Sequence, residues 1–286
     1  MSDSPRPAPP SAEPVIIPPD NCSSKVRLSC FPAIDCSNRS PNDRELGLLL
    51  SSLLHIHGAC VLKNLIPPDV LSQCVSTTSK HLPLHRGSYR SGFLESSTNR
   101  WHLSMHKVKD KLITNSLAEC ETSYQEWLPY FFDRREFKRT QFQFLRSEPG
   151  SGGKNQMFHQ DNSKRGLTFL IPLVDVPLIR GPTQLLLSTH RLTGSALQSA
   201  SVLNSAASSI SNVASTVSIH APTLEAGDVL VYDSRTLHRG LKNRDVEGRP
   251  TLILRYDEVG SEPPGHGAFS TTIFRGIGNV LAMLAK

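Results

Sequence analysis

The stretch Gln156-Met-Phe-His159-Gln-Asp161 is the part of the chain from which the rest is best interpreted. On a β-strand, side chains two residues apart share a face, so we expect His159 and Asp161 to point to one side and Gln160 to the other. An imidazole and a carboxylate placed in this way can bind one metal ion from adjacent positions. Because H-x-D occurs by chance in many chains, the meaning of this short motif depends on the residues around it.

A second histidine far downstream is the expected third ligand. It is His238, in Asp233-Ser-Arg-Thr-Leu-His238-Arg-Gly240. Two imidazoles and one carboxylate on one face of an ion, with the other positions open, are typical of non-haem Fe(II) oxygenases. His190 is an alternative ligand, but it follows a predicted strand where the chain turns polar. We therefore expect His190 to fix that turn by hydrogen bonding.

The residues after His238 predict an anchor for a dicarboxylate. Two apolar runs, Val229–Tyr232 and Thr251–Tyr256, are predicted strands with turn formers between them, so the chain returns and brings Arg249 alongside His238. A guanidinium there can hold a distal carboxylate through two parallel hydrogen bonds, and Thr251 can add a hydroxyl donor. In isolation Arg249 would be taken for a surface arginine at the start of a strand, but the metal motif favours the anchor.

Periodicity and turn residues predict the elements around these motifs. We expect a helix that Ser40 caps and Pro41 opens, with leucines between Leu46 and Leu54 on its buried face. A core strand is predicted at Arg139–Arg146, with Phe142 and Phe144 on one side. The other predicted elements are a strand at Ala59–Lys63, a helix from Pro67 to about His81, a loop over 84–104, a helix at Tyr124–Phe132 and a strand at Thr183–Leu187.

Several motifs occur together in a fixed order. They are Gln156-x-x-His159-x-Asp161, Gly181-Pro-Thr183 with Ser188-Thr-His190, Gly227-Asp228 up to Asp233, and His238-Arg-Gly240-x-x-Asn243 with Arg249. This set resembles the phytanoyl-CoA dioxygenase-like family of Fe(II)- and 2-oxoglutarate-dependent oxygenases, over roughly residues 43–260. The segment 58–67 is similar to the family's first core strand and the start of a helix. The chain departs from the family at Leu187-Ser-Thr-His190, usually Pro-Gly-Ser-His, and at Gly240, where some relatives carry serine.

The resemblance implies a mainly β fold with flanking helices around a double-stranded β-helix core, a jelly roll of the cupin kind. It implies Fe(II) on His159, Asp161 and His238, with 2-oxoglutarate and O2 as cosubstrates and ascorbate as a stimulant of turnover. It places the distal carboxylate of 2-oxoglutarate on Arg249, beside Thr251, and it places Gln156 and Thr183 where family members often contact the cosubstrate. No catalytic side chain is expected beyond the metal ligands. The expected substrate contacts are Trp101, His102, Phe158 and Arg235, and Arg86, Tyr89, Arg90 and Arg100 of the predicted loop are further candidates.

The expected activity is oxidation of a C–H bond, most simply hydroxylation, of a small organic molecule, with release of succinate and CO2. Asp161 disfavours halogenation, because halogenating relatives carry a small residue at that position. Two alternatives stay open. One is the same chemistry on a protein or peptide side chain, which would favour an open groove. The other is a metal-binding jelly-roll regulatory protein without turnover, against which the predicted anchor Arg249 argues.

Composition agrees with one sizeable domain. The chain has 286 residues, of which 38% are hydrophobic, and this is enough to bury a substantial core. We expect a disordered N-terminal extension over 1–40, the oxygenase domain over 41–275 and a tail over 276–286. Within the domain, the Ser/Ala-rich segment 194–218 is an insertion or a lid. Six cysteines without a CxxC pair disfavour structural zinc and a disulfide framework.

Charge and hydropathy limit the expected partners. The net charge is +6, but the charges are scattered and no aromatic-basic platform accompanies them, so we expect a small-molecule substrate and no nucleic acid. No apolar run is long enough for a membrane span, and the first residues do not resemble a signal peptide. A cytoplasmic location is the expectation, and the sequence leaves the oligomeric state open.

Overall fold

The computed structural model describes residues 31–37, 43–85, 92–95, 97–105, 126–150, 153–162, 164–192 and 218–260. Most of the predicted N-terminal extension, nearly all of the Ser/Ala-rich segment and the whole C-terminal tail lie outside these ranges. The candidate substrate contacts Arg86, Tyr89 and Arg90 lie outside them as well.

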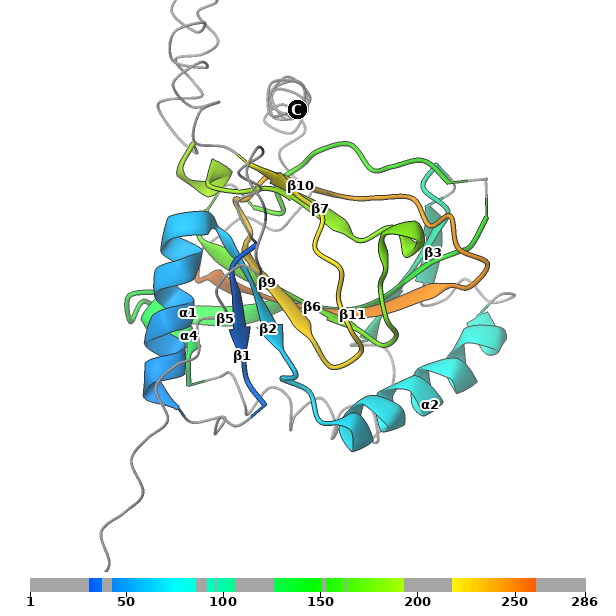
Figure 1. Cartoon of the computed structure of the whole chain (residues 1–286), viewed down its shortest axis with the longest axis horizontal. Helices are drawn as coiled ribbons and strands as arrows, with labels where there is room; N and C mark the ends of the chain where they lie inside the picture. The colour runs from blue at the N-terminus through cyan, green and yellow to red at the C-terminus, as the bar shows by residue number, and fades with distance from the viewer. Residues whose placement is uncertain are drawn as a thin grey trace, which may run out of the picture.

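Two sheets form the body of the protein. The larger has eight strands in the order β1-β2-β9-β6-β11-β5-β4-β3, and the smaller has the order β10-β7-β8. Figure 1 shows β7 and β10 across from the large sheet, with α1 and α2 outside it. This is the expected jelly roll. The strands are β1 Ala33–Asp35, β2 Ala59–Lys63, β3 Gly92–Glu95, β4 Arg100–Ser104, β5 Phe137–Ser147, β6 Gly166–Pro172, β7 Thr183–Leu186, β8 Ile219–His220, β9 Val229–Asp233, β10 His238–Gly240 and β11 Arg249–Glu258.

The large sheet separates two apolar cores. On its outer face Phe142 and Phe144 of β5 pack with Leu50 of α1 in a cluster that also takes residues from β6, β9 and β11. On its inner face a smaller cluster, which includes Val61 and Leu185, fills part of the space between the two sheets. Every residue of β9 is buried, as expected for a continuous apolar run with packing on both sides. The inner face also carries polar side chains, and these build the site described below.

Helix α1, Arg44–His57, covers part of the outer face. It begins at Asp43, whose side chain accepts hydrogen bonds from the backbone N–H groups of Glu45 at 2.9 Å and Leu46 at 3.3 Å. The expected cap at Ser40 is therefore wrong. The helix ends at Gly58, which has a φ of 79° in the left-handed region that favours glycine.

Two further predictions need correction. The predicted helix Tyr124–Phe132 is only α4, Leu128–Phe131, in the described residues, and the chain turns away at Asp133 and Arg134, both with positive φ. The predicted loop over 84–104 instead contains the end of α2, Pro68–His85, and the antiparallel pair β3–β4. Strand β4 is a short alternation of polar and apolar residues, and it is held by pairing with both β3 and β5. Among the described helices, none combines the length and apolar character of a membrane span.

Candidate metal centre

His159 and His238 come from neighbouring backbone segments. The two residues form an isolated antiparallel bridge, in which each backbone N–H donates to the other's carbonyl at 2.9 Å. Asp161 is fixed separately, because its N–H donates to the carbonyl of Ser234 at 2.9 Å. The prediction that His159 and Asp161 lie on one regular strand is wrong, since only this single bridge forms. The two side chains nevertheless reach the same point.

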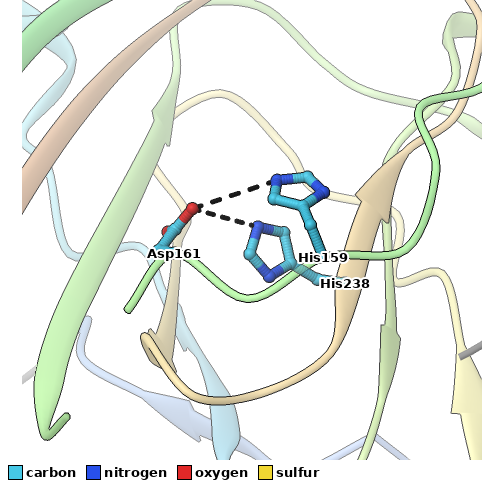
Figure 2. A group of neighbouring side chains, drawn as sticks. All are labelled: His159, Asp161 and His238. Atoms are coloured by element: carbon cyan, nitrogen blue, oxygen red, sulfur yellow. Dashed lines mark ion pairs between the residues drawn. The ribbon is translucent and has the colours of Figure 1, made fainter. Parts of the chain in front are cut away.

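The three side chains converge. The ligand atoms of His159, Asp161 and His238 all lie within 4.8 Å of one another, which is a spacing that could hold a metal ion. Oδ1 of Asp161 lies 3.9 Å from Nε2 of His159 and 3.5 Å from Nε2 of His238. Figure 2 shows one carboxylate oxygen of Asp161 facing both imidazole rings.

The other ring nitrogen of each histidine is already bonded. Nδ1 of His159 lies 2.9 Å from the carbonyl oxygen of Met157, and Nδ1 of His238 lies 2.9 Å from that of Thr236. A carbonyl oxygen only accepts, so Nδ1 carries the proton in each ring and the Nε2 lone pair points into the centre. This is the usual way in which a second partner fixes the tautomer and orientation of a metal-binding histidine.

Two hydroxyl groups orient the carboxylate. Oδ2 of Asp161 accepts from Thr168 Oγ1 and from the Tyr232 hydroxyl, each at 3.0 Å, which leaves Oδ1 for the centre. Burial alone would raise the pKa of Asp161, but its interactions with His238, Arg255 and His159 hold it well below its ordinary value. Burial, together with the adjacent His238, lowers the pKa of His159 to about 4. At neutral pH these are a carboxylate and a neutral imidazole, the forms that bind metal.

His190 has a different role. It lies in the 3₁₀ helix η3, Thr189–Leu192, and its Nε2 lies 3.0 Å from the carbonyl oxygen of His55 at the end of α1. It is not part of the converging group. The prediction that it fixes a turn by hydrogen bonding is confirmed.

The three candidate ligands line a cavity of about 150 Å³ between the two sheets, together with all four predicted cosubstrate contacts. Thr251 follows Arg249 on the inner face of β11. Gln156 lies over β10, where its backbone N–H donates to the Gly240 carbonyl at 2.9 Å and its Oε1 accepts from the Gly240 N–H at 3.0 Å. Thr183 is the strand partner of the same glycine.

Arg249 has the properties expected of a carboxylate anchor. Its side chain is buried, and its Nη1 atom has no hydrogen-bond partner in the described protein. Burial, together with the nearby Arg100, lowers the pKa of Arg249 to about 9, so the guanidinium is still charged at neutral pH. A buried cation with an open donor is costly unless an anion joins it. The cavity is therefore suited to a ligand with a carboxylate at the Arg249 end and metal-binding groups at the other.

The expected substrate contacts are only partly in the cavity. His102 lines it, with Nδ1 2.6 Å from Nε2 of Gln143. Trp101 alternates to the other face of β4 and is not in the lining. Phe158 is fully buried beneath the guanidinium of Arg239, 4.4 Å away. Arg235 pairs with Asp233 and borders a separate hollow.

Sequence reasoning missed several groups around the site. Thr168 and Tyr232, which hold Asp161, lie in strands that it treated only as apolar or left unassigned. Gln141 and Gln143 line the cavity from β5. The signal for these two glutamines was present, because Phe142 and Phe144 were predicted to face one side and the intervening polar residues had to face the other.

Comparison with known proteins agrees with this geometry. The family model described as Phytanoyl-CoA dioxygenase (PhyH) matches residues 54–250, while no curated protein matches the sequence. One similar solved structure is the non-heme alpha ketoglutarate dependent epimerase SnoN from nogalamycin biosynthesis, at 15% identity and a TM-score of 0.60, with 79% of this chain and 89% of that chain covered. A second SnoN structure contains Fe3+, alpha ketoglutarate and nogalamycin RO, at 16% identity, a TM-score of 0.59 and coverages of 79% and 93%.

A third is SnoK, the non-heme alpha ketoglutarate dependent carbocyclase from nogalamycin biosynthesis, at 14% identity and a TM-score of 0.59, with 80% of this chain and 90% of that chain covered. At such identities the structural likeness shows the fold alone. The family match, in contrast, spans more than half of the sequence, and all three converging side chains lie within it. The protein belongs to the phytanoyl-CoA dioxygenase family and is an Fe(II)- and 2-oxoglutarate-dependent oxygenase.

Proposed function

We propose that this oxygenase hydroxylates a C–H bond of a small organic molecule, with release of succinate and CO2. The observation that carries the proposal is that the open donor of buried Arg249 and the three converging side chains His159, Asp161 and His238 line one cavity. The guanidinium of Arg249 matches a distal carboxylate, and the three converging side chains match a ferrous ion with open coordination positions.

The protein side chains fit the iron that the family uses. His159, Asp161 and His238 would hold it, with the donor atoms already oriented by Met157 and Thr236 carbonyls and by two hydroxyls. Bound Fe(II) supplies the activation of O2 that is coupled to oxidative decarboxylation of the 2-oxo acid. The side chains would position the cosubstrate at the centre.

The cavity favours a small molecule over a protein side chain. Its walls combine apolar residues, such as Leu170, Val176 and Ile253, with polar ones, such as His102 and Gln143. The cavity has a volume of about 150 Å³ and opens to solvent on one side, and this size suits a small molecule better than an extended peptide. The solved structures with this fold include an epimerase and a carbocyclase, so the test of the reaction type is identification of the product.

The first experiment is an anaerobic titration of the iron-free protein with Fe(II) and then with 2-oxoglutarate. We expect the visible charge-transfer band of a 2-oxo acid chelated to ferrous iron. The band should be absent in Asp161→Ala and retained in His55→Ala, which removes an exposed histidine outside the cavity. Iron binding without a band in the wild type would contradict the proposal and favour the metal-binding regulatory protein.

Product analysis then addresses the reaction. With Fe(II), 2-oxoglutarate, O2 and a panel of small molecules, we expect succinate release to be stimulated by the true substrate and the product to gain one oxygen atom. Stimulation without oxygen gain would replace hydroxylation by another oxidation at the same centre. Stimulation by peptides alone would favour the protein-hydroxylase alternative.

A further inference from the structure

Three polar side chains stand in a row across the inner face of the large sheet. In the ladder between β4 and β5, Arg100 is directly opposite Ser147, and in the ladder between β5 and β11, Ser147 is directly opposite Arg249. Opposed residues in antiparallel strands place their side chains on the same face, close together. The register therefore brings two guanidinium groups to either side of one hydroxyl group, although the three residues are far apart in the sequence.

All three side chains are buried, and each has a polar atom without a partner. Arg100 and Ser147 are 0% exposed and Arg249 is 4% exposed. Arg100 Nε, Ser147 Oγ and Arg249 Nη1 have no hydrogen-bond partner within the described protein. Buried polar atoms are nearly always bonded, so three unsatisfied atoms on opposed strand positions, two of them on arginines that line the cavity, indicate a missing ligand. Since both guanidiniums only donate, that ligand must accept hydrogen bonds.

The charges around Arg100 and Arg249 also indicate that the missing ligand is an anion. No carboxylate accepts a hydrogen bond from Arg249 within the described protein, and Arg100 donates from Nη2 to the backbone carbonyl of Leu241 at 3.0 Å. The acid whose charge acts on Arg100 is Glu95, and its Oε2 already accepts a hydrogen bond from Thr98 Oγ1 at 2.5 Å. Burial and mutual repulsion lower the pKa of Arg249 to about 9, and burial lowers the pKa of Arg100 to about 10. An anion between the two guanidiniums would relieve both effects.

Gly240 makes room for the second guanidinium. A Cβ atom at this position would lie 2.3 Å from Nη2 and 2.6 Å from Cζ of Arg100, which is closer than real contacts allow. The guanidinium of Arg100 therefore occupies the space that a side chain at position 240 would fill. Gly240 lies in β10, two residues after His238, and it lines the same cavity as Arg100 and Arg249.

We propose that Arg100, assisted by Ser147, binds the distal carboxylate of 2-oxoglutarate together with Arg249. The inference rests on the proposed function, which places that carboxylate at Arg249. A carboxylate has two oxygens with about four acceptor positions, so it can accept from two guanidiniums and a hydroxyl at once. The consequence is specificity: a 2-oxo acid that ends in a methyl group would leave two buried cations unpaired and would be rejected strongly.

The test compares two ligands that differ at one end. 2-Oxopentanoate carries a methyl group where 2-oxoglutarate carries its distal carboxylate, and both chelate iron through the same oxo-acid group. Dissociation constants for both are measured by the charge-transfer band of the anaerobic Fe(II)-loaded protein, in the wild type and in Arg100→Met. We expect Arg100→Met to raise the dissociation constant of 2-oxoglutarate by about 10- to 100-fold, as for loss of hydrogen bonds to a charged group. The dissociation constant of 2-oxopentanoate should change by less than about threefold.

Two further variants separate binding from folding. Gly240→Ala keeps the charge but displaces the guanidinium of Arg100. It should also weaken binding of 2-oxoglutarate more than binding of 2-oxopentanoate. Arg146→Met is the matched control, because Arg146 follows Leu145 on β5 and faces away from the cavity near Glu148. It removes an equal charge at nearly the same place in the sheet, and both affinities should stay unchanged.

Three results would overturn the inference. If 2-oxoglutarate binds Arg100→Met as tightly as it binds the wild type, Arg100 serves something other than the cosubstrate, such as an anionic group of the substrate. An equal loss for both 2-oxo acids would show that Arg100 only supports the fold. A wild-type protein that binds Fe(II) but neither 2-oxo acid would remove the proposed function itself, and that outcome differs from the first two because it needs no variant.

Discussion

Each ligand side chain in the candidate centre has a second polar atom that the protein has already bonded. The Nδ1 atoms of His159 and His238 bond backbone carbonyls two residues earlier in their own chain segments. Asp161 receives two hydroxyl groups on the oxygen that faces away from the imidazoles. Since few rotamers remain open to these side chains, binding a metal costs them little further order. The protein's own hydrogen bonds thus orient all three side chains towards one point.

Loss of a ligand and loss of the anchor should have different effects. We expect His238→Ala to abolish Fe(II) binding, because two protein ligands remain. We expect Arg249→Met to retain Fe(II) binding and to weaken 2-oxoglutarate by about 100-fold, since a paired charge is removed from a buried site. Anaerobic titrations with Fe(II) and then with 2-oxoglutarate measure both constants. Equal loss of iron in the two variants would contradict the division of roles.

The hydroxyl groups that donate to Oδ2 of Asp161 should raise the affinity of the centre for Fe(II). Burial, followed by the neighbouring Asp161, raises the pKa of Tyr232 well above its ordinary value, so its hydroxyl stays protonated and donates to the carboxylate. We expect Tyr232→Phe to fold normally and to lower Fe(II) affinity by about 10-fold, the low end for loss of such a partner. Tyr256→Phe, at a buried tyrosine in the outer core, should leave the affinity unchanged. Equal affinities for all three proteins would show that the hydroxyl does not act on the centre.

Helix α1 illustrates how a secondary-structure element is tied to the sheet. Its Leu46, Leu50 and Leu54 recur at a four-residue spacing and are all buried, whereas Leu48 is 46% exposed. The spacing places one stripe of the helix on the outer core. At its C-terminal end, Gly58 leaves no room for a side chain, because a Cβ there would lie 2.4 Å from Nδ1 of His190.

Two leucines of this helix form a matched pair for a stability test. We expect Leu50→Ala to lower the free energy of unfolding by about 2–4 kcal/mol, because it leaves a cavity in a packed core. Leu48→Ala should change it by less than about 0.5 kcal/mol, as for most surface substitutions. Denaturant titrations of the two variants and the wild type provide the comparison. Similar losses at both positions would mean that the helix does not dock through the predicted stripe.

The elements that the sequence predicts well are those whose pattern is local. The apolar runs of β9 and β11 and the alternation at Phe142 and Phe144 correspond to strands in the structure. Strand β4 was missed although Arg-Trp-His-Leu-Ser alternates polar and apolar residues, because five residues without a β-branched side chain are a weak signal. In the structure the strand is held by pairing with β3 on one side and β5 on the other. The N-cap was misplaced because Ser40 and Asp43 are both good capping residues, so the choice depends on where the chain meets the core.

The same distinction applies to the candidate site. The residues His159, Asp161, His238 and Arg249 follow from motifs, and all four line one cavity. The row of Arg100, Ser147 and Arg249 depends instead on the register of three strands. A slip of one residue in either ladder would turn these side chains to the opposite face. Such a long-range quantity cannot be deduced from a single sequence.

Several histidines across the molecule share one electrostatic property. His57, His190 and His220 lie in or near three different elements, and burial lowers the pKa of each from its ordinary value of 6.5. The folded protein therefore binds fewer protons than the unfolded chain once the pH falls below about 6.5. The stability from keeping these rings neutral is complete above that pH and is lost as the pH falls. The lowered carboxyl pKa values, such as that of Glu95, act at lower pH, below its ordinary 4.5.

We therefore expect the melting temperature to be lower at pH 5.5 than at pH 7.5, measured in the presence of a chelator so that metal release does not contribute. His190→Asn, which keeps a hydrogen-bonding side chain but cannot be protonated, should reduce this difference. His55→Asn should not, because His55 is exposed. A wild-type protein with the same melting temperature at both pH values would contradict the argument. If His190→Asn leaves the difference in melting temperature unchanged, the pH dependence comes from His57 and His220 instead.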